Sequence, residues 1–184
     1  MNKVADKRII KSQNAIQTTF LTMLIEEGFD QITVKKITQV ADISRKTFYL
    51  HYVDKYDLLD TIVNKKLEEL EVICERKKEM GFIAGTVIWF KYFELHRDFF
   101  SALFKSNSTV SFRKQLLSFI IKQVNLKISE FNPEKNSEIL QRFLSMAVLG
   151  IIESWLSDEL KASMEQIAEE VGKLLEKNIL DMPQ

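Results

Sequence analysis

Glycine, proline, cysteine and histidine are scarce in this chain of 184 residues, which contains five, two, one and two of them respectively. So few glycines and prolines leave little room for the tight turns of a β-sheet protein, and the sequence therefore predicts an all-α fold. The single cysteine, Cys74, cannot form an internal disulfide, and neither its spacing nor its neighbours indicate a metal site. Two histidines, one cysteine and no glycine-rich phosphate loop provide no recognisable catalytic set, so we expect neither an enzyme nor a cofactor.

Long apolar runs and an overall charge are also missing. No window approaches the roughly 18 continuous apolar residues of a membrane span, and residues 1–14 lack the apolar core of a secretion signal, so we expect a cytoplasmic protein. The formal net charge is zero, which by itself argues against a nucleic-acid partner. Residues 1–56 nevertheless contain nine Lys or Arg against six Asp or Glu. The N-terminal part is therefore the one expected to face phosphate groups.

The segment 33–52 has the pattern of a helix-turn-helix, in which two short helices flank a tight turn. Thr33 is placed to cap the first helix, because its hydroxyl can accept a hydrogen bond from a backbone N–H left unpaired at the helix start. The apolar spacing predicts an inward face made of Ile37, Val40 and Ala41. The spacing breaks at Asp42, the expected turn residue, since Asp tolerates left-handed backbone angles better than most non-glycine residues.

The second helix of the motif, from Arg45 to Tyr52, is too short to be stable alone and must be held by its neighbours, with Phe48 as its anchor in the core. Ser44 is placed to cap this helix, and Asp54 to cap a third helix that begins at Lys55. The polar side chains that point away from the core can bind phosphate groups or base edges. We therefore predict a DNA-binding surface made of Thr33, Lys36, Arg45, Lys46, Thr47, Tyr49, His51 and Lys55.

Within this surface the residues are expected to have two roles. We assign phosphate contacts to Tyr49, His51 and Lys55, the last beside the free N–H groups of a helix start. Arg45 and Thr47 are assigned to base edges, because Arg can reach guanine O6 and N7 and Thr can contact a thymine methyl group. The alternative is that these side chains form an ordinary solvated helix face.

Several positions around the motif follow a known family pattern. The first helix of that pattern ends in a glycine and an aromatic residue, here Gly28 and Phe29, and a Thr-Val pair, here residues 33–34, begins the second helix. The run Ser-x-x-Thr-Phe-Tyr-x-His-aromatic-x-x-Lys-x-x-Leu-Leu then occupies residues 44–59. From about Ile16 to Leu59 the chain thus resembles the TetR-type bacterial transcriptional regulators.

The resemblance implies an N-terminal three-helix DNA-binding domain over residues 1–56 and a C-terminal helical bundle over residues 57–184 that dimerises through its last two helices. Such a homodimer would read a near-palindromic operator in double-stranded DNA, with half-sites about 34–36 Å apart or at a larger whole-turn spacing. Asp42 stands where the family usually has glycine and Thr38 where it usually has a smaller residue, and neither change breaks the fold. The alternative for the apolar surface of the last two helices is the core of a monomer.

Beyond the motif the sequence predicts further helices. The third helix continues to about residue 78, Gly81 marks a break, and helices follow over residues 82–94, 98–104, 112–131, 133–157 and 164–180. Asn132 and Pro133 are expected to open the helix over residues 133–157, with Asn as the N-cap and Pro at the first helical position.

Aromatic residues are concentrated in the middle of the chain, and regulators of the family that it resembles commonly release DNA when a small molecule binds among the central helices. We predict a pocket for an apolar or aromatic effector lined by Trp89, Phe93, Phe100, Phe104, Phe119, Met146 and Trp155. A packed aromatic core is the alternative. The predicted function is a dimeric repressor released by a small apolar effector. An activator or co-regulator controlled by a protein partner is the other hypothesis, because the C-terminal residues resemble a branch of the family that includes such regulators.

Overall fold

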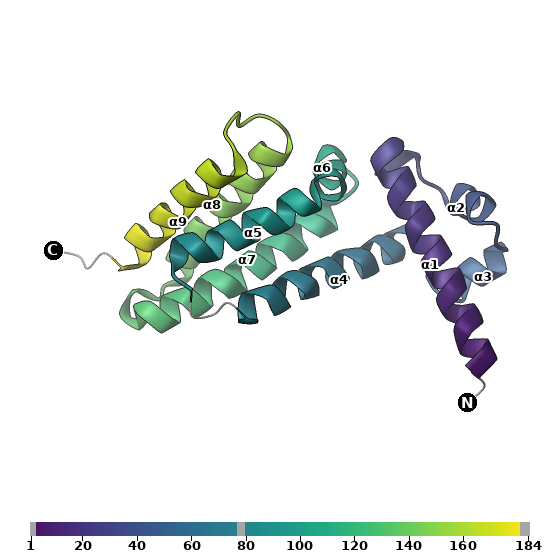
Figure 1. Cartoon of the computed structure of the whole chain (residues 1–184), viewed down its shortest axis with the longest axis horizontal. Coiled ribbons are helices and arrows are strands. Elements are labelled where there is room, and N and C mark those ends of the chain that lie inside the picture. Colours follow the sequence, from purple (N-terminus) through teal and green to yellow (C-terminus); the bar gives the residue numbers. More distant parts are fainter. Residues whose placement is uncertain (1–2, 77–79, 181–184) are drawn as a thin grey trace.

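The computed structural model of the chain describes residues 3–76 and 80–180. All regular structure in these two ranges is helical, and they contain no β-strand, which confirms the predicted all-α fold. Figure 1 shows a small group of helices at the N-terminal end of the molecule and a larger helical bundle at the other end, joined by one long helix.

The N-terminal group comprises α1 (Lys3–Glu26), a 3-10 turn η1 (Phe29–Gln31), α2 (Val34–Val40) and α3 (Arg45–Tyr49). The long helix α4 (Lys55–Arg76) begins in this group and runs into the bundle (Figure 1). The predicted boundary between residues 56 and 57 falls inside α4, and the division of the chain into two domains stays a prediction. The core of the group is aromatic, since Phe20, Phe29 and Phe48 have no exposed surface.

The helix caps predicted within the helix-turn-helix and at the start of the third helix are confirmed. The Oγ1 of Thr33 accepts the backbone N–H of Lys36 at 3.2 Å, and the Oγ of Ser44 accepts that of Thr47 at 3.0 Å. Asp54 caps α4 by accepting two backbone N–H groups of its first turn, at 2.8 and 2.9 Å. Asp42 has the expected left-handed backbone, with a φ of 51°. These local signals therefore fix where each helix of the motif begins.

Two details of the motif differ from the prediction. Val40 is 68% exposed rather than inward-facing, because the buried side of α2 is centred on Ile37, Thr38 and Ala41. At about 100° per residue, Val40 points roughly 110° away from that centre. The helix α3 also ends at Tyr49 rather than Tyr52, and the chain continues as a turn in which the backbone N–H groups of residues 51 and 52 both bind the carbonyl of Phe48.

The C-terminal bundle comprises α5 (Phe82–Leu95), α6 (Arg97–Lys105), α7 (Val110–Phe131), α8 (Glu138–Leu156) and α9 (Met164–Leu180). In Figure 1, α9 lies along α5. Their approach depends on Gly172, since a Cβ at this position would lie 2.6 Å from the Cα of Ile83. Arg113 on α7 pairs with Glu153 on α8 at 2.6 Å and so joins these neighbouring helices.

The start of α8 corrects the predicted role of Asn132 and Pro133. Pro133 opens only a 3-10 turn, η2 (Pro133–Lys135), and α8 begins five residues later at Glu138. The Nδ2 of Asn132 donates to the carbonyl of Ile179 at 3.1 Å, so this side chain fastens the end of α9 instead of capping a helix. Ser137 is the N-cap of α8, and its Oγ accepts the backbone N–H of Leu140 at 3.1 Å.

The helix α8 is unusually apolar. Within the described part of the chain it is the one helix long and apolar enough to cross a membrane, with a mean hydropathy of 1.4. Its apolar run is interrupted by Arg142 and Glu153, and 39% of its most apolar 18-residue stretch is buried inside the molecule. Core helices meet the same criterion of length and composition, so the criterion alone assigns no membrane to this helix.

Candidate DNA-binding surface and cavity

The short helix α3 lies at the end of the molecule away from the bundle (Figure 1). Arg45 and Lys46 are exposed, and Tyr49 is 57% exposed with its ring packed edge-on against the buried Phe48 at 5.6 Å between ring centroids. The anchor therefore holds the helix in place while three donors remain accessible. This is the arrangement that contact with base edges and phosphates requires.

Thr33, Lys36 and Thr47 have local partners. The hydroxyl of Thr33 caps α2, and that of Thr47 lies 2.9 Å from the Oγ of Ser44. The Nζ of Lys36 donates to Glu27 at 2.7 Å. The two side chains are 46% and 40% exposed, respectively. An exposed ion pair of this kind contributes about 0–1 kcal/mol, so Lys36 can exchange Glu27 for a phosphate at little cost.

His51 is held by a residue that the sequence did not single out. Its Nε2 lies 2.8 Å from the Oγ of Ser12 on α1. The same hydroxyl lies 3.0 Å from the carbonyls of Arg8 and Ile9, to either of which it can donate, and it then accepts N–H from His51. A neutral ring in this arrangement has an unprotonated Nδ1, so donation to phosphate requires either a protonated ring or a reversed hydrogen bond.

Lys55 has its ammonium group turned toward the backbone of its own domain. Its Nζ donates to the carbonyls of Phe29 at 3.1 Å and Ile32 at 2.9 Å and lies 4.4 Å from the centroid of the Phe29 ring. Burial lowers the pKa of Lys55, and the nearby Asp30 carboxylate opposes this shift. The phosphate contact predicted for this side chain therefore requires these hydrogen bonds to break. The structure gives Lys55 a structural role that the sequence did not indicate.

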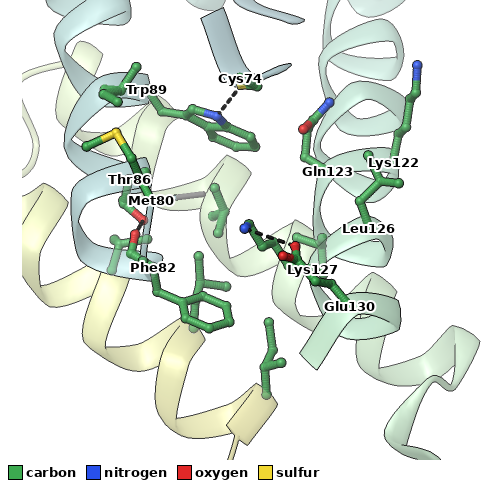
Figure 2. A pocket seen from close by; sticks show the side chains of 18 of the residues that line it. Cys74, Met80, Phe82, Thr86, Trp89, Lys122, Gln123, Leu126, Lys127 and Glu130 are labelled. Atoms are coloured by element: carbon green, nitrogen blue, oxygen red, sulfur yellow. Dashed lines mark hydrogen bonds and ion pairs between the residues drawn. The ribbon is translucent and has the colours of Figure 1, made fainter. Parts of the chain in front are cut away.

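A cavity of about 410 Å³ lies in the bundle, between the end of α4, the start of α5 and the second half of α7. Figure 2 shows Cys74 and Trp89 at one end of this cavity and Phe82 toward the other, with the side chains of α7 across from them. Residues of α8 and α9 complete the wall, including Val148, Val171 and Ile179. The space is large enough for a small organic molecule.

The cavity wall is mainly apolar where α5, α8 and α9 form it and carries charged side chains where α4 and α7 form it. The indole Nε1 of Trp89 donates to the Sγ of Cys74 at 2.8 Å, and the hydroxyl of Thr86 is bound to the carbonyl of Phe82 at 2.8 Å. Burial raises the pKa of the Cys74 thiol, partly offset by the hydrogen bond from Trp89, so the thiol is kept protonated and poorly nucleophilic. Charged side chains occur among the lining residues on α4 and α7, where Lys122 pairs with Glu71.

The predicted pocket residues are mostly not part of this cavity, and Trp89 is the one member of the set that lines it. Phe93 and Phe100 are fully buried and pack against each other at 4.8 Å between centroids, and Phe104 contacts the same cluster through Phe112. Phe119 packs behind Trp89 at 5.6 Å, and Trp155 packs against Phe90 at 5.4 Å. Met146 is 55% exposed on α8. Aromatic rings that fill the space between helices leave no cavity there, so for these side chains the packed-core alternative describes the structure better.

Three of the missed lining residues share one face of α5 with the predicted Trp89. Phe82, Gly85, Thr86 and Trp89 recur at intervals of three and four and include small side chains, which leave space between helices. That spacing is visible in the sequence, although the cavity walls from α7, α8 and α9 follow from tertiary packing. Ser12, which holds His51, has no such local signal.

Two family models match this chain. Residues 21–62 match the family model of bacterial regulatory proteins of the tetR family, and residues 82–177 match the model of a transcriptional regulator C-terminal region. The chain belongs to the TetR family of bacterial transcriptional regulators. Members of this family bind DNA through the helix-turn-helix and typically dimerise, in agreement with the sequence resemblance.

Two relatives match this chain over only part of their own length. The chain is 36% identical over 69 residues to an uncharacterised HTH-type transcriptional regulator, YxbF of Bacillus subtilis, a match that covers 37% of this chain and 18% of YxbF. It is 26% identical over 98 residues to DhaS of Lactococcus lactis, the HTH-type dhaKLM operon transcriptional activator, covering 53% of this chain and 51% of DhaS. The matched length is thus about a fifth of the first relative and half of the second.

Solved structures share the fold over nearly the whole chain. A TetR transcriptional regulator from Streptococcus agalactiae superposes with a TM-score of 0.75 at 23% identity, covering 94% of this chain and 98% of the other. The dihydroxyacetone kinase operon activator DhaS superposes with a TM-score of 0.68 at 20% identity, covering 91% and 96%. At these identities the similarity establishes the fold, and function has to be argued from the residues of this chain.

Proposed function

We propose that this member of the TetR family is a homodimeric, cytoplasmic repressor that binds a near-palindromic operator and releases it when a small apolar molecule occupies the cavity. The observation that carries the DNA-binding part is the helix α3, whose core anchor Phe48 is fully buried while Arg45 and Lys46 are exposed. Thr33, Lys36, Thr47, Tyr49 and His51 are further members of the proposed surface. For Lys55, we propose that the backbone N–H at the start of α4 contacts a phosphate group in place of the ammonium group.

An uncovered apolar face supports dimerisation through α8 and α9. Ile139, Phe143 and Met146 are 82%, 64% and 55% exposed, and with Gly150 they recur at intervals of four and three along one face of α8. Leu174 on α9 is 57% exposed. Apolar side chains in such a row are a usual feature of helix–helix interfaces, and Gly150 would allow the two copies of α8 to approach closely. Met146, predicted to line the pocket, would then belong to the dimer interface.

The position of α4 supports control by a cavity ligand. This helix begins at Lys55, directly after the DNA-binding motif, and its last turns supply Glu71, Cys74 and Glu75 to the cavity wall. A ligand that displaces the end of α4 would therefore change the orientation of the motif. The side chains that α5, α8 and α9 supply to the wall are mainly apolar and favour an apolar or aromatic ligand, although Glu71, Glu75 and Lys122 also line the cavity.

A second candidate function is an activator or co-regulator controlled by a protein partner. It is favoured by one observation, the similarity to DhaS, which is a transcriptional activator. The two candidates make different predictions for the purified protein. A repressor released by a small molecule loses operator affinity when an apolar compound binds near Trp89, whereas a partner-controlled activator keeps its affinity until the partner protein is added.

The test of DNA binding is selection of bound sequences from a random duplex library at about 0.15 M salt, since phosphate contacts depend strongly on salt. We expect an inverted repeat whose half-sites are separated by a whole number of helical turns. The recovered operator then serves to screen apolar compounds for release, with quenching of Trp89 fluorescence as the binding signal and a Trp155→Phe background to isolate it. Recovery of no inverted repeat from correctly folded dimer would contradict the proposal.

A further inference from the structure

Two carboxylates of the N-terminal half meet hydrogen-bond donors near the start of α7. The Oδ2 of Asp30 in η1 accepts the hydroxyl of Ser106 at 3.0 Å. The Oδ1 of Asp60 on α4 accepts the hydroxyl of Ser111 at 3.1 Å and the Nε2 of Gln115 at 2.9 Å. These bonds join positions 51 to 76 residues apart in the sequence. They fasten the first helices to the bundle at two separate points.

The donor to Asp30 is held by the turn between α6 and α7. Ser106 is only 5% exposed, and its Oγ also accepts the backbone N–H of Ser108 at 3.1 Å. Thr109, 1% exposed, has its hydroxyl 2.6 Å from the carbonyl of Leu103 and 2.9 Å from that of Ser106. A turn with this many internal hydrogen bonds has little freedom to follow Asp30. The position of Asp30 is therefore set by the turn.

The carboxylate of Asp30 is favoured in its charged form. Hydrogen bonds from Ser108 and Ser106 lower the pKa of Asp30, and the Lys55 ammonium group acts in the same direction. Hydrogen bonds to a charged acceptor are roughly twice as strong as those between neutral groups. The contact at Asp30 therefore resists opening more than its exposed position suggests.

From Asp30 the contact continues to both helices that flank α3. The ammonium group of Lys55, at the start of α4, binds the carbonyls of Phe29 and Ile32 on either side of Asp30. Ile32 directly precedes Thr33, the N-cap of α2. A displacement of the α6–α7 turn would therefore reach the beginnings of α2 and α4 together.

The helix α7 also reaches the cavity. Its first half carries Ser111 and Gln115, and its second half supplies Gln123 and Leu126 to the cavity wall. An unbroken helix of 22 residues is about 33 Å long and transmits a displacement between its ends.

Gln115 gives a further indication that these bonds matter. Its Oε1 is buried and, within the described part of the chain, has no hydrogen-bond partner, whereas its Nε2 has two. A side chain chosen for packing alone would avoid the unpaired acceptor, which is unfavourable when buried. The two hydrogen bonds of Nε2, one of them to Asp60, offset the cost of this unpaired acceptor.

We propose that the α6–α7 turn and the first half of α7 orient the DNA-binding helices through Asp30 and Asp60, and so set the half-site spacing that the dimer accepts. This inference rests on the proposed function, because spacing has meaning only for a dimer that reads an inverted repeat. Lys55 is in this view a positioning residue of the same contact. A purely stabilising role would change the free energy of unfolding and leave the accepted spacing unchanged.

The experiment compares the wild-type protein with the double variant Ser106→Ala/Gln115→Met, which removes donors to both carboxylates without changing the charge of the chain. Both proteins, and a control variant Ser118→Ala at an exposed position of α7, are used in parallel selections from the random duplex library. The measured quantities are the half-site sequence, the distribution of half-site spacings and the Kd for the wild-type operator. Circular dichroism and gel filtration establish that each variant is folded and dimeric.

We expect the wild type and Ser118→Ala to recover one spacing. The double variant should recover the same half-site sequence at two or more spacings and bind the wild-type operator about tenfold more weakly, as expected for the loss of about two hydrogen bonds. A single unchanged spacing, or complete loss of binding by the folded variant, would overturn the inference. Should wild type recover no inverted repeat, the proposed function fails, and this inference fails with it.

If Ser106→Ala/Gln115→Met does not fold, the same bonds can be removed from the other side. Asp30→Ala/Asp60→Ala is then compared with Glu26→Ala/Glu68→Ala, which changes the charge equally at two exposed positions. Broadened spacing in the first pair only is the expected result. Equal spacing distributions in the two pairs would contradict the inference.

Discussion

Replacement of Lys55 by Met separates a structural from a DNA-contacting role for this residue. Met keeps the apolar stem of the side chain and removes the ammonium group. The wild-type group makes two hydrogen bonds to carbonyls, at 3.1 and 2.9 Å, and lies 4.4 Å from the centroid of the Phe29 ring. All three contacts are lost in the variant.

The expected magnitude follows from these contacts. Hydrogen bonds to a charged group contribute about 1.5–3 kcal/mol each, and a partly exposed cation–π contact about 0.5–1 kcal/mol. Part of this is offset, because burial lowers the pKa of Lys55 and so disfavours its charged form. Water can also reach the freed carbonyls at a half-buried site. We therefore expect Lys55→Met to lower the free energy of unfolding by about 2–3 kcal/mol.

The assay combines urea unfolding, followed by circular dichroism, with operator binding at several salt concentrations. Lys55→Met should shift the unfolding midpoint and leave the salt dependence of log Kd nearly unchanged. Lys46→Met, at an exposed position of α3, should do the opposite and lower the salt slope by about 1 per subunit. A reduced slope with unchanged stability for Lys55→Met would refute the reasoning and show that the side chain leaves its carbonyls to bind phosphate.

Three further predictions concern packing, assembly and pH. Gly172→Ala should destabilise the fold by about 1–3 kcal/mol in urea unfolding, because its Cβ would meet the Ile83 backbone at 2.6 Å. Gly85→Ala in α5 meets nothing within 4 Å and serves as the control, so an equal loss in both variants would contradict the packing argument. Phe143→Glu should raise the dimer Kd about 100-fold or more in sedimentation equilibrium, since it removes two large apolar side chains from the proposed interface. Leu95→Glu, exposed at the end of α5, should leave the Kd unchanged, and equal effects would argue against α8 as the interface. For Asp30, whose pKa is lowered below its ordinary value of 3.8, the unfolded chain binds the proton more readily than the folded chain. The stability of wild type relative to Asp30→Asn should therefore be constant above about pH 5 and fall as the pH drops through the folded-state pKa. Urea titrations between pH 6 and 2.5 measure this difference. A difference that does not change with pH would exclude the interaction of Asp30 with Ser106 and Ser108.

The DNA-binding motif was largely predictable because its signals are local. A cap such as Thr33 or Ser44 acts on a backbone N–H three residues away, and the left-handed turn at Asp42 depends on that residue itself. Asn132 shows the limit of this approach. It had the correct residue type for a cap, yet its amide binds the carbonyl of Ile179, 47 residues away, and the helix begins later at Glu138.

The contacts of Lys55 and His51 could not be predicted for the same reason. Their partners lie 23 to 39 residues away, and no periodicity in the sequence relates them. A basic or aromatic residue in the motif is consistent with a DNA contact and with an internal hydrogen bond. The tertiary structure decides which of the two the free protein makes.

The cavity was misplaced because the sequence shows where aromatic residues lie and does not show whether they leave space. Phe93 and Phe100 fill the core of the bundle by packing against each other. The cavity lies instead along the face of α5 that carries the small residues Gly85 and Thr86 beside Trp89. Small side chains at helical spacing were the better signal for this cavity.

The most direct test of the central claim is the affinity of wild type and Arg45→Ala for the selected operator and for a shuffled duplex of the same composition at about 0.15 M salt. We expect wild type to bind the operator at least about 10³-fold more tightly than the shuffled duplex, as specific DNA-binding proteins do. Arg45→Ala should lose about 1–3 kcal/mol on the operator and relax the preference at one base position per half-site. Equal affinity of wild type for both duplexes would contradict the account of this protein as a sequence-specific regulator.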